Sequence, residues 1–443
     1  MRVEDKYSWL LLVEKELDLF DCKIRDIYVW ELIRSEIYLA LLEREQLRTE
    51  VKHSQRLKNL YFEIKYYNRL FYFTRRKNVE HIIIEHSQYK SVNNNNIDIF
   101  TNSFINSSYQ FTQNTLILST SKERTVKDED IIYLGIYNDF FTGFNYLKNK
   151  YLFRMNIPIK MLSFKQLVDE TYGIKLDIKS IILRSISSFE YKYKTYRKIL
   201  NKLNPKSIVL TVAYSYKHLI HAARSLGITV NELQHGIIDD FTIEYALPNS
   251  AKYIPDNLYF YGNYWKKSIT YKPYKYKAKL YRINYIHKFD GIITQEKKMQ
   301  NRVLVISQWT IHEELFQFIV DLAQKFPNYE FVYRLHPLHN LDSEGEKIVD
   351  EYTHSLSNLI IEESNVDILK SLLITHFVIG CYSTAIFEAL YFKCKVYIYD
   401  NFGSKHLSSF VNKNLVYRGN NTKDFSQFLK WNNGVINSGE LYE

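Results

Sequence analysis

The chain has 443 residues, with 59 Lys and Arg against 49 Asp and Glu, a formal net charge of +10 and 46% hydrophobic residues. This length predicts two or three domains, and the composition excludes disordered and collagen-like classes. Gly and Pro are scarce, at 13 and 7 residues, so we expect few long linkers. Three cysteines without C-x-x-C spacing argue against a disulfide scaffold or a cysteine zinc site and favour a reducing compartment.

The first twenty residues hold a short apolar stretch that Glu14 and Glu16 interrupt. They lack the cationic start, apolar run and cleavage site of a signal peptide. No stretch supplies about 18 uninterrupted apolar residues, so we expect no transmembrane helix. The predicted location is the cytoplasm, either free or peripherally bound to a membrane.

Hydrophobic spacing predicts a helical region over residues 7–48, and the elements that follow it alternate between strand and helix. The expected strands of this first half lie at 81–85, 97–100, 115–118, 207–212, 228–233 and 258–261. Its expected helices lie at about 164–203 and at 214–226. This alternation predicts a parallel α/β sheet.

The same alternation restarts at residue 302. The expected strands of the second half lie at 302–306, 329–335, 359–361, 377–379 and 395–399. Its expected helices lie at 311–326, 366–371 and 384–392, with a terminal helix from 425. Neither half has G-x-G-x-x-G or a Walker A loop, so NAD-type and P-loop chemistry are not favoured.

We therefore expect an α/β protein with two Rossmann-like domains facing across a cleft, and ligands at the carboxyl ends of the strands. The predicted segments, in chain order, are a helical and basic N-terminal extension (1–78), a first Rossmann-like domain (79–265), a basic connector (266–300), a second Rossmann-like domain (301–421) and a C-terminal helix (422–443).

Two segments concentrate the excess positive charge. Residues 48–77 carry nine Lys or Arg against two Glu, with seven aromatic residues among them, and residues 266–288 carry eight Lys or Arg and no acid. Such segments suit an anionic membrane surface, single-stranded nucleic acid or a solvated helix face. Nucleic acid is the least favoured partner, because no nucleic-acid-binding motif accompanies these segments.

The first motif that could carry chemistry is Leu-Gln-His-Gly, directly after strand 228–233. Gly236 permits a close backbone approach, and His235 stands at a strand end where a base could act. Taken alone, His235 could equally be a turn histidine that the backbone satisfies. The second motif is Tyr-Arg-Leu-His-Pro, where strand alternation puts Arg334 and His336 on one face, both able to donate to phosphate oxygens.

The third motif is Cys-Tyr-Ser-Thr before the helix 384–392. Ser383 or Thr384 could cap this helix, whose first amides would favour an anion. Glu388 follows one turn later, where a carboxylate could accept hydrogen bonds from a ribose diol. Taken alone, each of these residues could be an ordinary cap or surface residue. Three such motifs at strand ends in two Rossmann-like halves favour a phosphate-bearing ligand.

These three motifs, in this order, resemble bacterial GT-B glycosyltransferases of surface-polysaccharide assembly. The most similar families by motif are the His-Pro sialyl-, polysialyl- and Kdo-type transferases and the CDP-glycerol glycerophosphotransferases. The resemblance runs from about residue 80 to residue 420. It implies that the second half holds the nucleotide-sugar donor. It assigns donor-phosphate contacts to His336, Ser383 and Thr384, and a ribose contact to Glu388.

The sequence departs from both families. Asp239-Asp240 is followed by Phe241 where the sialyltransferases have an acidic-acidic-Gly base motif, and Gly236-Ile237 stands where the glycerophosphotransferases have His-Gly-Thr. We predict an inverting, metal-independent sugar transfer in which a general base takes the proton of the acceptor hydroxyl. His235 is the first candidate for that base, followed by Glu85 and Asp239. No cofactor is predicted.

Asp128-Glu129-Asp130 is the one match to the metal-binding D-x-D pattern. It precedes the apolar run 131–134 within a charged stretch, so we interpret it as a solvated loop.

Three alternatives remain open at this point: a polyol-phosphate transferase of the CDP-glycerol type, a non-hydrolysing sugar-nucleotide epimerase, and a non-catalytic protein that binds anionic lipid or glycan. The predicted partners are a nucleotide-sugar donor, an oligosaccharide or lipid-linked glycan acceptor, and the anionic inner face of the cell membrane. The two basic segments suit peripheral attachment there.

Overall fold

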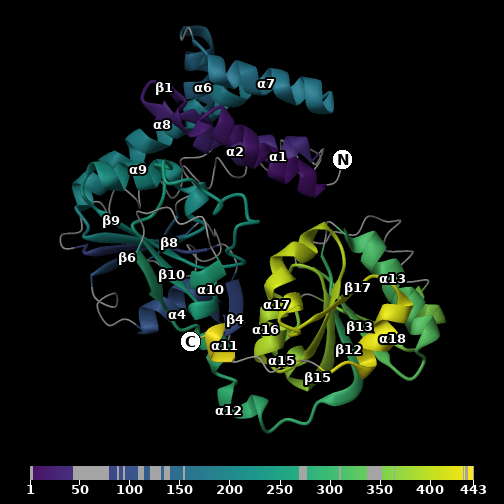
Figure 1. Ribbon diagram of the computed structural model, residues 1–443. Helices are drawn as coiled ribbons and strands as arrows, with labels where there is room; N and C mark the ends of the chain where they lie inside the picture. Colours follow the sequence, from purple (N-terminus) through teal and green to yellow (C-terminus); the bar gives the residue numbers. More distant parts are fainter. Residues whose placement is uncertain are drawn as a thin grey trace. The chain divides into compact units, whose positions relative to one another are not determined.

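The computed structural model describes most of the chain (Figure 1). The described residues are 3–42, 79–86, 89–92, 95–107, 114–119, 131–133, 140–152, 155–268, 277–308, 311–336, 352–363, 365–432, 434 and 438–442. Contacts between Cα atoms divide the chain into two compact units. The first unit comprises residues 1–260 and 266–281, and the second comprises 261–265 and 282–443.

The first unit is built on a seven-stranded sheet in which every pairing is parallel. The strands, in spatial order, are β11 (Lys277–Leu280), β10 (Asn257–Phe260), β9 (Thr229–Leu233), β8 (Ser207–Thr211), β3 (His81–Ile84), β6 (Thr115–Ser119) and β7 (Ile131–Tyr133). The inner strands β3 and β8 are buried along their whole length, and their Ile, Val and Leu are typical of parallel strands covered on both faces.

The N-terminal region belongs to this first unit. The predicted helical region 7–48 contains two helices, α1 (Val3–Glu16) and α2 (Val29–Leu41), with a short antiparallel pair, β1 (Lys23–Ile24) and β2 (Ile27–Tyr28), between them. An apolar core that includes Trp30, Phe164 and Ile182 joins α1 and α2 to α7 (Ile159–Tyr172) and α8 (Ile178–Leu203). This region is therefore part of the folded unit rather than a separate appendage.

The long helix predicted over 164–203 is two helices. Gly173 ends α7 in the left-handed conformation (φ 68°), which glycine adopts without steric cost, and the carboxylate of Asp177 caps α8 by accepting from the amide of Ser180. Helix α8 then contacts α2, α6 (Phe140–Leu152) and α9 (Lys217–Ser225). These contacts bring α2 and the start of α9 to the same side of α8.

The second unit is a six-stranded parallel sheet. Its strands, in spatial order, are β14 (Leu359–Glu362), β13 (Glu330–Arg334), β12 (Met299–Ile306), β15 (Thr375–Gly380), β16 (Lys395–Tyr399) and β17 (Tyr417–Gly419). Helices α13 (His312–Lys325) and α18 (Thr422–Lys430) pack on one face, and α15 (Ile368–Ile374) and α16 (Ala385–Tyr391) lie on the other (Figure 1).

The predicted α/β class with two Rossmann-like parallel units is confirmed. The predicted segment boundaries differ from the division into units. Residues 277–280, predicted to lie in a connector, form β11 and pair with β10 in the first sheet. The basic segment 48–77 and the acidic triplet 128–130 lie outside the described residues.

Candidate functional site

The first candidate site lies at the carboxyl edge of the first sheet, where three neighbouring strands end. Glu85 and His86 follow β3, Ala213 follows β8, and Gln234 and His235 follow β9. Because parallel strands end at the same edge of a sheet, residues far apart in the sequence meet there. The rings of His86 and His235 have centroids 5.3 Å apart.

The imidazole ring of His235 packs among other aromatic rings. Phe100 and Tyr214 have ring centroids 6.5 and 6.3 Å from its ring, and its Nδ1 is buried without a hydrogen-bond partner among the described residues. Burial, with a smaller contribution from the charge of His86, lowers the pKa of His235 to about 3. His235 is therefore neutral at pH 7, with a buried nitrogen that a ligand could satisfy.

The carboxylates beside His86 form a small acidic pair. Glu85 is buried, and its charge adds to the effect of burial in raising the pKa of Asp98 to about 6. Asp98 accepts hydrogen bonds from the amide of His86 (2.7 Å), the hydroxyl of Thr101 (2.7 Å) and the amide of Phe100 (3.0 Å). Asp98, which the sequence analysis missed, thus fixes the backbone of His86.

Asp239 lies in the turn that follows the Leu-Gln-His-Gly motif and is buried. Its Oδ1 accepts from the amides of Phe241 and Thr242 and from the hydroxyl of Thr242, each at 3.0 Å. The side chain therefore stabilises the turn, and its role as an alternative base stays a prediction.

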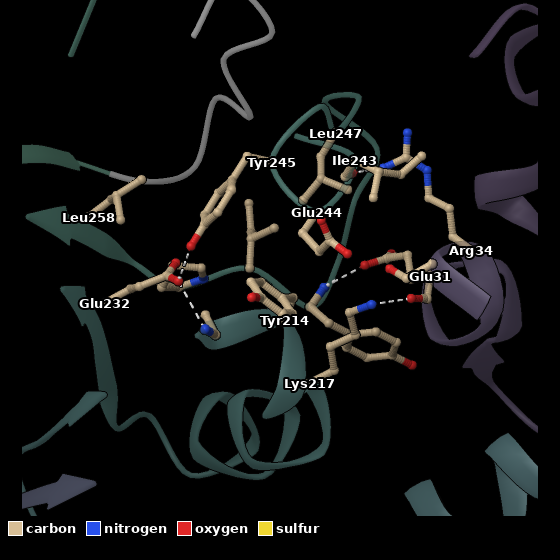
Figure 2. Close-up of a pocket in the computed structure, with 15 residues that line it drawn as sticks. Glu31, Arg34, Tyr214, Lys217, Glu232, Ile243, Glu244, Tyr245, Leu247 and Leu258 are labelled. Carbon is tan, nitrogen blue, oxygen red and sulfur yellow. Dashed lines mark hydrogen bonds between the residues drawn. The ribbon is translucent and has the colours of Figure 1, made fainter. Parts of the chain in front are cut away.

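Glu232 is a second residue that the sequence analysis missed. It lies on β9 with 1% of its surface exposed and accepts from the amide of Ala213 (2.9 Å) and the hydroxyl of Tyr245 (2.8 Å), as Figure 2 shows. Burial raises its pKa to about 7. The available signal was an acidic residue near the end of the predicted strand 228–233, three positions before His235.

Glu232 lines a cavity of about 40 Å³ whose opposite wall is α2 (Figure 2). The ammonium of Lys217 donates to the main-chain oxygen of Glu31, and the carboxylate of Glu31 accepts from the amides of Lys252 (2.7 Å) and Tyr253 (3.0 Å). A cavity of this size holds one to a few waters rather than a sugar.

The second candidate site lies at the carboxyl edge of the second sheet. His336 comes two residues after β13 and is half-buried, and Ser383 and Thr384 lie between β15 and α16. The strands β13 and β15 flank β12, so these residues follow strands that end at one edge. Ser383 Oγ accepts from the amide of Ala385 at 3.3 Å, and Glu388 lies one turn into α16, half-buried.

Arg334 is engaged within its own sheet. Its guanidinium donates to the carboxylate of Glu362 at 2.6 Å and to the main-chain oxygen of Val366 at 2.5 Å, and the residue is 7% exposed. Strands β13 and β14 pair in a register that sets Arg334 opposite Glu362. The positive charge is therefore already balanced, and a donor-phosphate contact from Arg334 stays a prediction.

Ser307 is a further residue that the sequence analysis missed. It follows the inner strand β12 directly and is 2% exposed, and its Oγ is buried without a hydrogen-bond partner among the described residues. A buried hydroxyl in this state costs about 1–3 kcal/mol unless a ligand or water satisfies it. A serine placed directly after an apolar strand was the only sequence signal.

The described residues contain no group of three or more His, Cys, Asp or Glu that could hold a metal ion. Among the same residues, no helix is both long enough and apolar enough to cross a bilayer.

No protein-family model and no curated protein matches the chain by sequence. Solved structures with a similar fold include the UDP-GlcNAc 2-epimerase of Methanocaldococcus jannaschii, at 12% identity and a TM-score of 0.47. The aligned region covers 81% of this chain and 96% of the epimerase chain. The Neisseria meningitidis UDP-GlcNAc 2-epimerase bound to UDP-GlcNAc has 13% identity and a TM-score of 0.45, covering 79% and 91%. Acinetobacter baumannii MurG has 10% identity and a TM-score of 0.42, covering 79% and 88%. This likeness concerns the fold alone and assigns no activity to the chain.

Proposed function

We propose that the chain is a glycosyltransferase that moves a sugar from a nucleotide-sugar donor to a growing surface polysaccharide or lipid-linked glycan, with inversion and without a metal. One observation carries the proposal: at the carboxyl edge of an inner strand in each sheet stands a buried polar atom that has no hydrogen-bond partner among the described residues. These atoms are His235 Nδ1 after β9 and Ser307 Oγ after β12. A ligand at each edge would satisfy them.

The proposal assigns the acceptor to the first unit. His235, neutral at pH 7, accepts the proton of the acceptor hydroxyl as that oxygen attacks the anomeric carbon of the donor. Its low pKa makes His235 a weak base, and Glu232, whose pKa of about 7 is better matched to proton transfer, is the second candidate. Glu85 and Asp239 remain the other two candidates.

The proposal assigns the donor to the second unit. As the bond between the sugar and the nucleotide phosphate breaks, hydrogen bonds from His336, Ser383 and Thr384 stabilise the departing phosphate, and Ser307 adds a fourth donor. Glu388 accepts from the ribose hydroxyls. The polyol-phosphate transferase alternative uses the same groups, but the acceptor oxygen then attacks phosphorus instead of carbon.

Donor profiling with mass spectrometry of the products tests the proposal. The purified chain is incubated with CMP-, CDP-, UDP- and GDP-linked sugars and with CDP-glycerol, each with and without a glycan acceptor. A glycan heavier by one sugar supports the proposal. Addition of glycerol phosphate supports the alternative, and an epimerised donor formed without acceptor identifies an epimerase. Absence of any nucleotide-dependent thermal shift overturns all three enzymatic assignments in favour of a binding protein.

Matched variants locate the chemistry. His336→Ala should weaken donor binding, whereas His376→Ala, at the amino end of β15 in the same sheet, should not. His235→Ala should lower kcat by about 10²–10⁴-fold with little change in donor binding. His221→Gln, on α9 and packed against Tyr193 and Tyr253, is its control. Unchanged turnover in His235→Ala removes His235 as the base.

Membrane attachment forms part of the proposal. Neutralising Arg75, Arg76 and Lys77 together should reduce co-sedimentation with anionic vesicles, because each basic residue near such a surface contributes about 1 kcal/mol. A second variant, in which three basic residues of the segment 266–288 are neutralised, tests the other basic segment in the same way. If neither variant binds less, the peripheral location is wrong.

A further inference from the structure

A second cavity of the first unit contains a concentration of positive charge. Its volume is about 310 Å³, and α2, α8, the turn after β8 and the start of α9 bound it. The lining residues that can bind an anion are Arg184, Ser185, Ser188, Lys192, Ser215 and Lys217. No Asp or Glu occurs among its described lining residues. The cavity thus offers three cations and three serine hydroxyls, beside the side chains of Tyr214 and His218.

Helix α8 presents most of these groups from one face. Arg184, Ser188 and Lys192 are spaced by four residues, and this spacing stacks side chains along one side of a helix. Ser187, between them, is fully buried and accepts from Asn149 instead. The polar and basic stripe is therefore a distinct face of α8, and the buried face of the helix carries the core.

Two of these cations have acidic neighbours: Glu36 lies beside Arg184, and the charges of Glu31 and Glu244 act on Lys217. Arg184 pairs with Glu36 at 2.6 Å, and the two side chains remain 47% and 26% exposed. Lys217 donates to the main-chain oxygen of Glu31, whose carboxylate two backbone amides already satisfy. Burial lowers the pKa of Lys217 to about 8, so its ammonium is charged at pH 7 at an energetic cost. An anion in the cavity would offset that cost.

The start of α9 adds a second, independent contribution. This nine-residue helix begins at Lys217, and no side chain caps it. The amides of Lys217 and His218, in its first turn, have no acceptor within the helix, and both residues line the cavity together with Ser215. Backbone amides, serine hydroxyls and cations together form a donor set that suits a tetrahedral oxyanion.

We propose that this cavity binds the phosphate group of a phosphorylated sugar. A volume of about 310 Å³ exceeds what a bare phosphate needs and reaches the lower end of the range for small-molecule sites. Tyr214 lines the cavity, and its ring centroid is 6.3 Å from that of His235. The assignment of this phosphate to the acceptor rests on the proposed function, whereas the binding test below does not depend on transfer.

Isothermal titration calorimetry of the full chain with inorganic phosphate and with glucose 1-phosphate tests the site. Both titrations use the His336→Ala variant as the background, because phosphate binding at the second unit would otherwise contribute to the measured heat. Lys192→Gln should weaken binding about tenfold, because one charge-assisted hydrogen bond is lost. Lys194→Gln is the matched control, since Lys194 is exposed on the same helix and does not line the cavity.

Arg184→Gln serves as a second variant, because its partly exposed pair with Glu36 contributes little to stability. It should weaken binding as Lys192→Gln does, with an unchanged melting temperature. Vesicles that contain phosphatidic acid distinguish the source of the phosphate, when vesicle binding is counted as the excess over phosphatidylserine vesicles of equal charge, which the basic segments bind equally. Loss of vesicle binding in both variants identifies a lipid-linked phosphate, and loss of only the soluble ligands identifies a free sugar phosphate. If the His336→Ala background binds no phosphate in any form, or if both variants bind as the background does, the proposal is wrong.

Discussion

His86 and His235 lie with their rings inclined by 32° and their centroids 5.3 Å apart, one after β3 and the other after β9. Strand β8 separates β3 from β9 in the sheet, so this contact spans the carboxyl edge of three strands. The two rings share one desolvated environment, and neither can be protonated without charging a buried group beside the other. Protonation of this pair is therefore coupled to the integrity of the strand-end site.

We predict that this pair makes the first unit sensitive to acid. Burial lowers the pKa of His86 to about 4 and that of His235 to about 3, from an ordinary value of 6.5. As the pH falls, the two histidines become protonated in the unfolded chain before they do in the folded protein. Their contribution to the free energy of unfolding is therefore fully present above pH 6.5 and is lost as the pH falls toward 3. Each histidine contributes at most about 1.4 kcal/mol per pH unit within this window. The melting temperature of wild type should fall from pH 7 to pH 4.5 more steeply than that of His86→Asn/His235→Asn.

The control for this prediction is the same comparison between pH 7 and pH 8.5, where neither imidazole titrates. The two proteins should then show parallel curves. Equal slopes between pH 7 and pH 4.5 would show that other groups cause the acid sensitivity.

Glu232 should act on stability in the opposite direction. Burial raises its pKa from 4.5 to about 7, so the folded state binds the proton more tightly than the unfolded chain does. The stabilising contribution is present below pH 4.5 and is lost as the pH rises through 7. A glutamine amide oxygen can accept from Ala213 and Tyr245 as the protonated carboxyl does. Glu232→Gln should therefore match wild type at pH 5 and melt higher at pH 8.5.

Activity separates the two possible roles of Glu232. If it supports the site without taking the proton, Glu232→Gln retains most of the kcat while its stability profile changes. If it is the base, kcat falls by about 10²–10⁴-fold, and the decrease of kcat at low pH is no longer seen. A variant with wild-type kcat and a wild-type stability profile would contradict the raised pKa itself.

The ion pair between Arg34 and Glu14 should be a large stabilising feature of the N-terminal region. Both side chains are almost fully buried, and the guanidinium also donates to the main-chain oxygens of Ile243 and Ala246. Removing one partner leaves an uncompensated buried charge, which costs about 3–5 kcal/mol. Arg34→Met should lower the urea midpoint of the first unit accordingly. Lys160→Gln, which breaks the exposed pair with Asp18, should change stability by under about 1 kcal/mol.

A folded first unit with an unshifted midpoint in Arg34→Met would show that α2 does not depend on this pair. The double variant Glu14→Gln/Arg34→Met removes both charges. It should recover part of the loss, because no buried charge then remains unpaired.

Hydrophobic patterns predicted the strands well because parallel strands are buried on both faces. The strand predicted at 395–399 coincides with β16 (Lys395–Tyr399), and both sheets contain the expected inner strands. The strand predicted at 97–100 is wrong: β5 (Asn95–Asp98) lies outside both large sheets, and a helix, α4 (Ile99–Ser107), begins at Ile99. Helix ends were harder to predict, although signals were present. Gly173 and Asp177 are a left-handed terminator and an N-cap, yet the apolar spacing on either side predicted one continuous helix.

The sequence could not predict which residues of neighbouring strands lie beside the site residues. Alternation along the strand predicts a shared face for Arg334 and His336, but only the register with β14 reveals that Glu362 stands opposite Arg334. Asp239 resembles a base in its motif, whereas its local turn engages the carboxylate. The sequence analysis missed Glu232 and Ser307 because the burial and hydrogen-bond partners of a polar residue in or after a strand depend on neighbours that the sequence does not reveal.

Gly403 offers the last prediction, since it packs against the residue before Ser383. A Cβ at Gly403 would lie 1.8 Å from a ring carbon of Tyr382, so any larger residue must displace that ring. Moving Tyr382 shifts the backbone of Ser383 at the edge of the second sheet. Gly403→Ala should therefore lower the melting temperature and raise the KM for the nucleotide-sugar donor several-fold. Gly143→Ala, an exposed α6 position with nothing within 4 Å, should leave KM unchanged and add about 0.5–1 kcal/mol of stability. A lower melting temperature with an unchanged donor KM would separate the packing of Tyr382 from the position of Ser383, and the proposed phosphate contact from Ser383 would lose its support.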